Sequence, residues 1–282
     1  MTFKDLTIVI ATFKSQFTIK ECLRSIDPRV RVIIIENSDS IDFKNKIERE
    51  FSNVKCELAN KNLGYGTANN IGLKKVQTKY ALILNPDTIL SKDSLNYFFD
   101  FTKTNNDFAI LGPNQNEKIL YLDDNSKKNL EYYETKEIKG YAMFLNINKF
   151  RNIGFFDENF FLYLEEIDLC KRVKDLNEKI LINPKILIFH YGGKSVDNKH
   201  LSEVELIRNW HWMWSIFYFN RKHSGYLIAL LKILPRLFSS CFRIIFYSLV
   251  FNNKNRQIYL KRLGGIINSI LGNKSWYRST LE

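Results

Sequence analysis

The fold class is decided by the stretch YALILNPDT, which runs from Tyr80 to Thr88. Five apolar residues end abruptly in a polar turn, and an amphipathic segment with helical periodicity follows near residues 91–104. A short apolar run bounded by turn residues is typical of a β-strand that is buried on both faces. The stretch therefore predicts a strand followed by a helix.

The same pattern occurs three times before this stretch. Strand-like runs are each followed by a helical segment, at 6–11 with 15–26, at 32–35 with 41–51, and at 54–58 with 66–76. Strands that alternate with helices predict an α/β fold with a parallel sheet covered on both faces. Such sheets bind their ligands at the carboxyl ends of the strands.

The rest of the chain is organised differently. Between 108 and 195 the sequence predicts strands at 108–111, 140–146, 179–182 and 186–190, with a helix that begins near Leu164. From about Leu201 the pattern becomes helical and rich in aromatic residues. We therefore expect a catalytic domain at 1–200 and a basic, helical region at 201–282.

Composition excludes several classes of protein. The 282 residues are 45% hydrophobic and 26% charged, which is typical of a globular rather than a disordered chain. Cys22, Cys56, Cys170 and Cys241 are far apart and form no C-x-x-C pair, which favours scattered thiols in a reducing compartment. The first residues lack the pattern of a signal peptide, so we expect a cytoplasmic protein.

The positive charge is concentrated near the C-terminus. Of the net +12, +11 lies between Arg208 and Glu282, where Glu282 is the only acid. A basic segment of this kind favours an anionic partner, either phospholipid or nucleic acid. Nucleic acid is the weaker interpretation, because the charges alternate with long aliphatic runs rather than forming a polar, aromatic-studded groove.

The segment from Tyr226 to Phe251 is mostly apolar, but Lys232, Arg236 and Arg243 interrupt it. At roughly 100° per residue these three fall on one narrow stripe of a helix. The pattern suits a helix that lies in the bilayer interface better than one that crosses the bilayer. The alternative is a solvated stripe on a helix that packs against the catalytic domain or a second subunit.

A glycine-rich turn precedes the third predicted helix. It contains Asn62, Gly64, Gly66, Asn69 and Asn70. Glycines permit close approach of the backbone, and a helix N-terminus presents free N–H groups to an anion such as a diphosphate. An ordinary glycine turn with an asparagine-rich cap remains the alternative.

Two residues are candidates for a metal site. Asp87 ends the fourth strand region, and its carboxylate suits a hard divalent cation that also binds phosphate. His190 follows a later strand, and neutral imidazole is a common metal ligand. The competing interpretations are a turn in which Asp87 caps the next helix, and a structural histidine.

Three acids begin the helix near Leu164, namely Glu165, Glu166 and Asp168. Adjacent, partly desolvated carboxylates raise the pKa of one of them, which suits that group to accept a proton. Alternatively, the helix dipole stabilises these acids and Asp168 pairs with Arg172 at the i,i+4 spacing.

Taken together, these motifs resemble glycosyltransferase family 2, the inverting enzymes of GT-A fold, and especially its rhamnosyltransferase-like members that act on bacterial surface polysaccharides. The resemblance runs from Leu6 to about Ser195 and continues more weakly to the end of the chain. It implies that Ala11 and Thr12 line the base and ribose of the nucleotide, and that Glu36, beside Asn37, accepts a hydrogen bond from a uracil or thymine ring.

The resemblance also assigns the later motifs. Asn62, Gly64, Gly66, Asn69 and Asn70 fall in the family's donor-binding turn and helix. Asn85, Pro86 and Asp87 occupy its Asp-x-Asp position, with Asn85 as a donor-binding residue, and His190 occupies that of a late metal-binding histidine. The implied cofactor is Mg²⁺ or Mn²⁺.

Two residues depart from the family pattern. Asn85 replaces the first acid of Asp-x-Asp, and Glu166 stands where many relatives have Asp. The resemblance implies an in-line displacement in which Glu166 is the catalytic base and the anomeric configuration inverts. Glu165 and Asp168 are then acceptor-binding or structural acids.

The expected donor is a dTDP- or UDP-sugar, with dTDP-rhamnose favoured by the resemblance. The expected acceptor is a glycan or a polyprenyl-linked oligosaccharide at the inner face of the cell membrane, where the enzyme is peripherally bound, as a homo-oligomer or alone. A nucleotidyltransferase and a non-catalytic, membrane-docked nucleotide-sugar-binding module are the alternatives.

Overall fold

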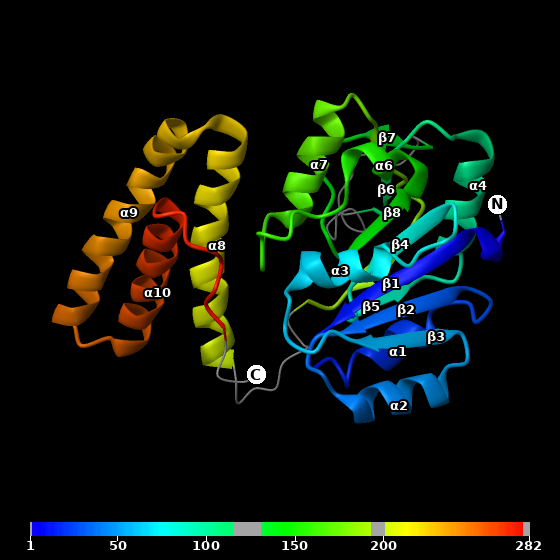
Figure 1. Cartoon of the computed structure of the whole chain (residues 1–282), viewed down its shortest axis with the longest axis horizontal. Coiled ribbons are helices and arrows are strands. Elements are labelled where there is room, and N and C mark those ends of the chain that lie inside the picture. The colour runs from blue at the N-terminus through cyan, green and yellow to red at the C-terminus, as the bar shows by residue number, and fades with distance from the viewer. Residues whose placement is uncertain (1, 115–130, 193–200, 279–282) are drawn as a thin grey trace, which may run out of the picture. The chain divides into compact units, whose positions relative to one another are not determined.

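The computed structural model describes residues 2–114, 131–192 and 201–278. The chain forms two units (Figure 1). The α/β unit comprises Met1–Phe156 and Glu166–Ser195, and the helical unit comprises Asp157–Glu165 and Val196–Glu282. The expected boundary near residue 200, and Ser195, after which the family resemblance is weaker, lie outside the described residues.

The α/β unit is built on an eight-stranded sheet. In spatial order its strands are β3 (Val54–Leu58), β2 (Arg31–Glu36), β1 (Leu6–Thr12), β4 (Tyr80–Leu84), β8 (Ala142–Asn146), β6 (Ile110–Gly112), β9 (Ile180–Ile182) and β7 (Tyr133–Glu134). The first four are parallel, as the sequence predicts. Beyond β4 the sheet is mixed, because β8 runs antiparallel to both β4 and β6. The prediction of an α/β fold with a mostly parallel sheet is confirmed.

A second, two-stranded sheet pairs β5 (Thr88–Leu90) with β10 (Ile188–His190) in antiparallel orientation. The sequence predicts a strand at 186–190 but not its partner. A three-residue strand directly after Asn85-Pro86-Asp87 gives no periodic signal that distinguishes it from a turn.

Helices cover both faces of the main sheet. In chain order they are α1 (Ile19–Arg24), α2 (Ile41–Glu50), α3 (Tyr65–Leu73), α4 (Ser94–Thr104), α6 (Phe150–Ile153) and α7 (Glu165–Asp175), with 3₁₀ turns at Phe3–Asp5 and Ile147–Lys149. The helix expected at 15–26 is shorter, because residues 16–18 form a turn before Ile19 and the helix ends at Arg24.

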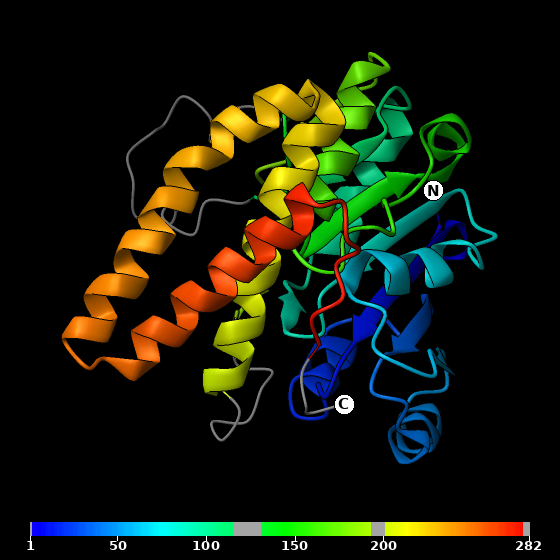
Figure 2. The same ribbon diagram turned by 60° about the vertical axis from the view of Figure 1, so that its left-hand side comes forward.

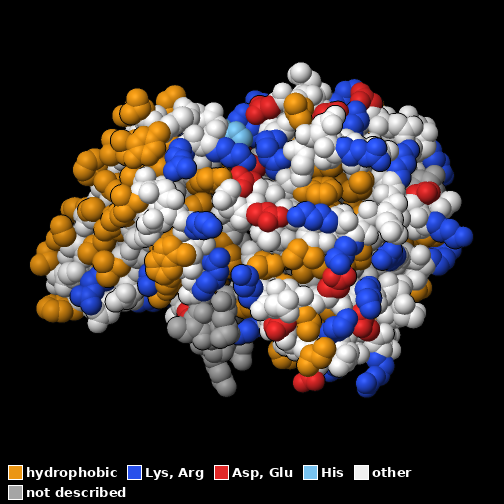
Figure 3. Space-filling view, viewed as in Figure 1, with side chains coloured by type: hydrophobic (Ala, Val, Ile, Leu, Met, Phe, Trp, Pro, Cys, Tyr) orange, Lys and Arg blue, Asp and Glu red, His pale blue; other side chains and the backbone are white. Residues whose placement is uncertain are grey.

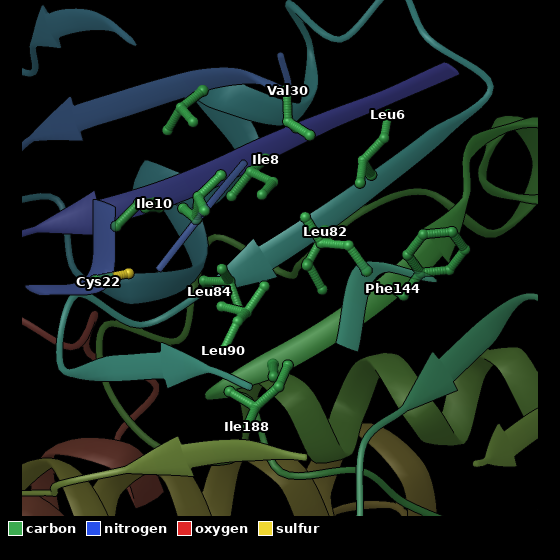
Figure 4. Close-up of a cluster of buried hydrophobic side chains, with 14 of the residues drawn as sticks. Leu6, Ile8, Ile10, Cys22, Val30, Leu82, Leu84, Leu90, Phe144 and Ile188 are labelled. Carbon is green, nitrogen blue, oxygen red and sulfur yellow. The ribbon is translucent and has the colours of Figure 1, made fainter. Parts of the chain in front are cut away.

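Alternation along β1 explains the two apolar layers. Leu6, Ile8 and Ile10 point to one face, where they pack with side chains from α1, α2 and α4 (Figure 4). Val9 points to the other face and belongs to the cluster that contains Leu73 of α3. Successive side chains of a strand point to opposite faces, so a continuous apolar run is required where both faces are covered.

The helical unit contains three long helices, α8 (Leu201–Ser224), α9 (Tyr226–Leu249) and α10 (Asn253–Ile270), seen from a second side in Figure 2. Met213, Phe217, Ile233 and Ile266 form its buried core. A Cβ atom at Gly265 would lie 2.2 Å from the Trp210 carbonyl oxygen, so α8 and α10 approach too closely for any larger residue.

The segment Asp157–Glu165 packs with these helices rather than with the sheet. The Tyr218 hydroxyl donates to Asp157 Oδ2 at 3.0 Å, and Lys222 Nζ donates to the same oxygen at 2.7 Å. Ser215 also donates to the Leu162 carbonyl at 2.9 Å. The sequence gives no indication of this exchange, because the contacts join residues more than fifty positions apart.

None of the helices in the described part of the chain combines the length and the apolar character that crossing a membrane requires.

Candidate functional site

Several of the predicted site residues lie at one edge of the main sheet. β1 pairs with β2 so that Thr12 lies opposite Glu36, and it pairs with β4 so that Ile10 lies opposite Leu84. The strands are parallel, so their carboxyl ends meet there. Ala11, Thr12, Glu36, Asn37 and Asn85 are therefore brought together along this edge.

Hydrogen bonds to Glu36 join the ends of β1 and β2. The Thr12 hydroxyl donates to Glu36 Oε2 at 2.5 Å. The Ser38 hydroxyl and its backbone N–H donate to Oε1, the latter at 2.8 Å. Glu36 is 1% exposed, and both of its carboxylate oxygens already accept hydrogen bonds. A nucleobase contact at Glu36 stays a prediction, and the observed function of this carboxylate is to fix the two strand ends.

Asn37 connects this edge to the glycine-rich turn. Its Oδ1 accepts from the Leu63 N–H at 3.3 Å, while Asn62 Oδ1 accepts from the Gly64 N–H at 3.1 Å. Gly64 is the N-cap of α3 and has a φ of 80°, a conformation that strongly favours glycine. The turn is thereby held beside the sheet edge, with the N-terminus of α3 directly after it.

The two asparagines of α3 are directed to backbone groups. Asn70 Nδ2 donates to the Phe156 carbonyl at 2.9 Å, and the Phe156 N–H donates to Asn70 Oδ1 at 3.0 Å. Asn69 Nδ2 donates to the Tyr65 carbonyl at 3.0 Å. Asn70 therefore fixes residue 156 to the helix, a positioning contact that the sequence does not reveal.

Asp87 and His190 are adjacent in the structure although they are a hundred residues apart in the chain. His190 Nε2 lies 3.2 Å from Asp87 Oδ1. The pairing of β5 with β10 places His190 opposite Thr88, and the Tyr191 N–H donates to the Asp87 carbonyl at 3.0 Å. This small ribbon is the element that creates the pair.

The pair fits a divalent cation. Two ligands at right angles on an octahedral cation, each about 2.1 Å from it, lie about 3.0 Å apart. The observed 3.2 Å between His190 Nε2 and Asp87 Oδ1 agrees with that separation. Within residues 2–114, 131–192 and 201–278, no cluster of three or more His, Cys, Asp or Glu side chains suits a metal ion.

Tyr141 completes the surroundings of this pair. Its ring stacks on the His190 imidazole with a centroid separation of 4.8 Å and an angle of 8° between planes. Its carbonyl accepts from the Asn85 N–H at 2.9 Å. Tyr141 thus contacts His190 through its ring and Asn85, two residues before Asp87, through its carbonyl, and the sequence analysis does not identify it.

The acidic motif begins α7 after a strained turn. Tyr163 and Leu164 have φ values of 73° and 68°, which is costly for two consecutive residues other than glycine. Glu165 and Glu166 follow at once as the first residues of α7. Strain of this kind persists where the surrounding structure fixes it, and it clusters at functional sites.

Glu166 has the electrostatic character expected of a base. Burial raises the pKa of its carboxyl above the ordinary value, and the negative charge of Glu137 raises that pKa further. The sequence predicts such a shift but assigns it to neighbouring acids of the same motif. The acid that the structure identifies comes from a different segment, about thirty residues earlier.

Asp168 is fully buried and forms an ion pair with Arg172, whose Nε lies 2.9 Å from Asp168 Oδ2. Arg172 also donates to the carbonyl oxygens of Ile153 at 2.7 Å and of Phe155. This contact matches the i,i+4 alternative, and it gives Asp168 a structural function.

Glu166 lies close to the glycine-rich turn. A Cβ atom built on Gly140 would be 3.5 Å from Glu166 Cβ and 3.4 Å from the Tyr65 hydroxyl oxygen. That hydroxyl donates to the Gly140 carbonyl. Since Tyr65 is the first residue of α3, Gly140 joins the candidate base to the candidate diphosphate-binding helix end.

Comparison with known proteins supports this interpretation. Residues 7–169 match the family model described as glycosyl transferase family 2. The chain is 24% identical over 200 residues to the low-salt glycan biosynthesis hexosyltransferase of Haloferax volcanii, covering 62% of this chain and 64% of that protein, a little less than two thirds of its length. It is 24% identical over 250 residues to a rhamnosyltransferase of Escherichia coli strain K12, covering 76% of this chain and 92% of that one.

Solved structures agree on the fold. A mannosyltransferase from Pyrobaculum calidifontis, solved with GDP-Man and Mn²⁺, aligns with a TM-score of 0.59 at 10% identity. The alignment covers 96% of this chain and 88% of the mannosyltransferase chain. TarS 1-349 of S. aureus, solved with UDP, has a TM-score of 0.54 at 14% identity, with 97% and 93% covered. The expected GT-A fold is confirmed. Since the family model spans more than half of its length, the chain belongs to glycosyl transferase family 2.

Proposed function

We propose that this protein is an inverting glycosyltransferase that moves a sugar from a nucleoside diphosphate to a hydroxyl group of a glycan or polyprenyl-linked acceptor in surface polysaccharide synthesis. The observation that carries the proposal is the contact of 3.2 Å between Asp87 and His190 at the carboxyl edge of the sheet. Family membership and the named hexosyl- and rhamnosyltransferase relatives support it.

The donor occupies the sheet edge. Ala11, Thr12 and Asn37 contact the nucleoside, while Glu36 holds the strand ends in place through Thr12 and Ser38. The diphosphate faces the turn at Gly64, where the N-terminal N–H groups of α3 and its dipole favour negative charge. Asp87 and His190 would hold Mg²⁺ or Mn²⁺, and the bound cation would neutralise charge on the diphosphate leaving group.

Glu166 is the catalytic base. As its carboxylate takes the proton from the acceptor hydroxyl, the acceptor oxygen forms a bond to the anomeric carbon. The bond from that carbon to the phosphate oxygen breaks, and nucleoside diphosphate leaves from the opposite face. Burial and Glu137 raise the pKa of the Glu166 carboxyl, and the raised pKa makes this carboxylate a better proton acceptor at neutral pH.

The sugar is a hexose or deoxyhexose. The alignment with the rhamnosyltransferase covers 92% of that protein, and this similarity favours dTDP-rhamnose among dTDP- and UDP-sugars. We place the enzyme at the inner face of the cell membrane, where a polyprenyl-linked acceptor would be found.

The test is to incubate purified protein and Mn²⁺ with UDP-, dTDP- and GDP-sugars and a short glycan acceptor, and to identify products by mass spectrometry and NMR. We expect one donor to give nucleoside diphosphate and a glycoside of inverted configuration. Release of pyrophosphate would instead identify a nucleotidyltransferase. Tight donor binding without turnover for every acceptor would identify a non-catalytic binding module.

A further inference from the structure

One face of α9 is left uncovered by the rest of the helical unit. Its large apolar side chains recur at helical spacing and are 62–74% exposed, namely Leu227, Leu231, Phe238, Phe242, Ile245 and Leu249. At about 100° per residue these six fall within an arc of roughly 60°. We call this set the α9 apolar face, and Figure 3 shows hydrophobic side chains gathered over this part of the helical unit.

The exposed area is large for a water-facing surface. Ile228, Phe246, Val250 and Phe251 extend the face and are 47–90% exposed. Taking about 200 Å² for a fully exposed large side chain, the whole set presents on the order of 1,000 Å². The largest apolar patch on a typical monomer is about 300–600 Å², so this face belongs in contact with another apolar phase.

Arginines lie beyond the residues that extend this face: at about 100° per residue, Ile228 and Phe246 fall at about 100° from Leu227, and Arg236 and Arg243 at about 160–180°. Arg243 donates to the Tyr259 hydroxyl at 2.5 Å, and its guanidinium lies 5.1 Å from the centre of that ring. Arg262 of α10 lies 5.3 Å from the same ring centre. Burial lowers the pKa of Arg262, and the positive charges of Arg243 and Arg236 lower it further. Arg236, Arg243 and Arg262 therefore form one cluster of like charge.

The cluster has unmet capacity for an anion. No acid lies between Leu206 and Leu281, and two acids of the helical unit outside that span pair with lysines, Asp157 with Lys222 and Glu205 with Lys254. An external anion such as phosphate is therefore a favourable partner for the three guanidinium groups.

The α9 apolar face and the arginine cluster together favour an anionic bilayer over a second copy of the chain. A second copy of the chain would bring two acid-free, positively charged surfaces together, which is repulsive. A bilayer of anionic phospholipid offers an apolar interior for the exposed face and phosphate groups for the arginines. Long arginine side chains beyond the edge of an apolar face reach the headgroup layer readily.

We propose that the α9 apolar face and the cluster of Arg236, Arg243 and Arg262 form a docking surface for an anionic lipid bilayer. The apolar side chains enter the boundary between headgroups and acyl chains, and the guanidinium groups bind lipid phosphate. The cluster differs from the stripe of Lys232, Arg236 and Arg243 that the sequence predicts. Lys232 Nζ donates to Asn220 Oδ1 at 3.1 Å within the helical unit, and Arg262 joins the cluster from another helix.

The experiment measures cosedimentation of the full chain with vesicles of phosphatidylcholine and phosphatidylglycerol, without donor, so that docking is scored independently of transfer. We expect the double substitution Phe238→Ser and Phe242→Ser to weaken binding roughly a hundredfold. The triple substitution Arg236→Gln, Arg243→Gln and Arg262→Gln should weaken it to a similar extent and abolish the preference for phosphatidylglycerol.

Control variants remove the same kinds of side chain from the α/β unit, so that a loss of binding can be assigned to α9 rather than to a general loss of apolar surface or charge. Leu176→Ser removes an exposed apolar side chain from the α/β unit, and substitution of the exposed Arg31, Arg49 and Lys92 by Gln removes the same charge elsewhere. Both should leave docking within about twofold of the unsubstituted protein. Circular dichroism verifies folding, and Phe238→Ser alone serves if the double variant is unstable.

Three outcomes overturn the proposal. The first is that the unsubstituted protein fails to sediment with these vesicles at low salt. The second is that the control variants lose as much binding as the α9 variants. The third is a dimer by analytical ultracentrifugation that Phe238→Ser and Phe242→Ser convert to monomer without changing vesicle binding, which would assign the face to a second copy.

Discussion

Ile8 on β1 is 0% exposed and Phe242 on α9 is 69% exposed, although both are large apolar side chains in regular secondary structure. In the α/β unit, helices cover both faces of the sheet, and the polar groups of interest lie at its carboxyl edge. In the helical unit, α9 uses one face for the unit's core and leaves another exposed. In the two proposals made above, the first unit carries out the chemistry and the second attaches the enzyme to a bilayer.

The largest expected effect tests whether chemistry is confined to the α/β unit. Glu166→Gln keeps nearly the same shape but cannot take a proton, so kcat should fall about 10²–10⁴-fold while the KM for the donor changes little. Steady-state kinetics with a soluble acceptor measures this, and vesicle binding should be unaffected.

The neighbouring acids are the controls. Asp168→Asn weakens the ion pair with Arg172 and should lower the melting temperature more than it lowers kcat. If Glu166→Gln transfers sugar normally while Glu165→Gln or Asp168→Asn does not, the base is another carboxylate.

Asp87→Ala should reduce kcat about 10²–10³-fold, because it removes the only acid of its motif from the diphosphate site. Isothermal titration should show weaker Mn²⁺ binding in the presence of nucleoside diphosphate, and chelation by EDTA should inactivate the unsubstituted enzyme. Asp93→Ala is the matched control, since Asp93 is exposed and makes no side-chain cap at α4. Full activity after exhaustive chelation would exclude the cation.

The buried Ile8 and the exposed Phe242 should differ in how much they contribute to stability. Ile8→Ala should lower the free energy of unfolding by about 2–5 kcal/mol, because it leaves a cavity between the sheet and its helices. Phe242→Ser should change that free energy by about 0.5 kcal/mol or less, because its side chain is already in water. Urea denaturation measures both, and equal losses would show that the α9 apolar face is packed in solution.

The smallest expected effect is a shift in pH dependence. Since the pKa of Glu166 is raised, kcat/KM should fall as the pH drops through that raised value, where the base becomes protonated. Glu137→Gln removes one cause of the increase, so the acid limb should move to lower pH by less than about one unit. An unchanged limb would mean that burial alone sets the pKa or that Glu166 is not the base.

Sequence patterns anticipated the elements whose signal is local. The first four parallel strands, the helix that begins at the acidic motif and the long apolar helix from Tyr226 are all present. β5, the antiparallel direction of β8 and the packing of Asp157–Glu165 against α8 were not anticipated. Those features depend on pairing between distant segments, which leaves no periodic trace in either segment.

The candidate site shows the same division. By its residue types alone, the sequence determined that the chain carries a glycine-rich turn, an Asn-Pro-Asp motif and a cluster of acids in the order typical of glycosyl transferase family 2. Only the tertiary structure decided that Asp87 meets His190, that Glu137 raises the pKa of Glu166, and that Arg262 joins Arg236 and Arg243. The physical reason is that electrostatic and coordination effects depend on distance in space, and the fold sets that distance between residues far apart in the chain.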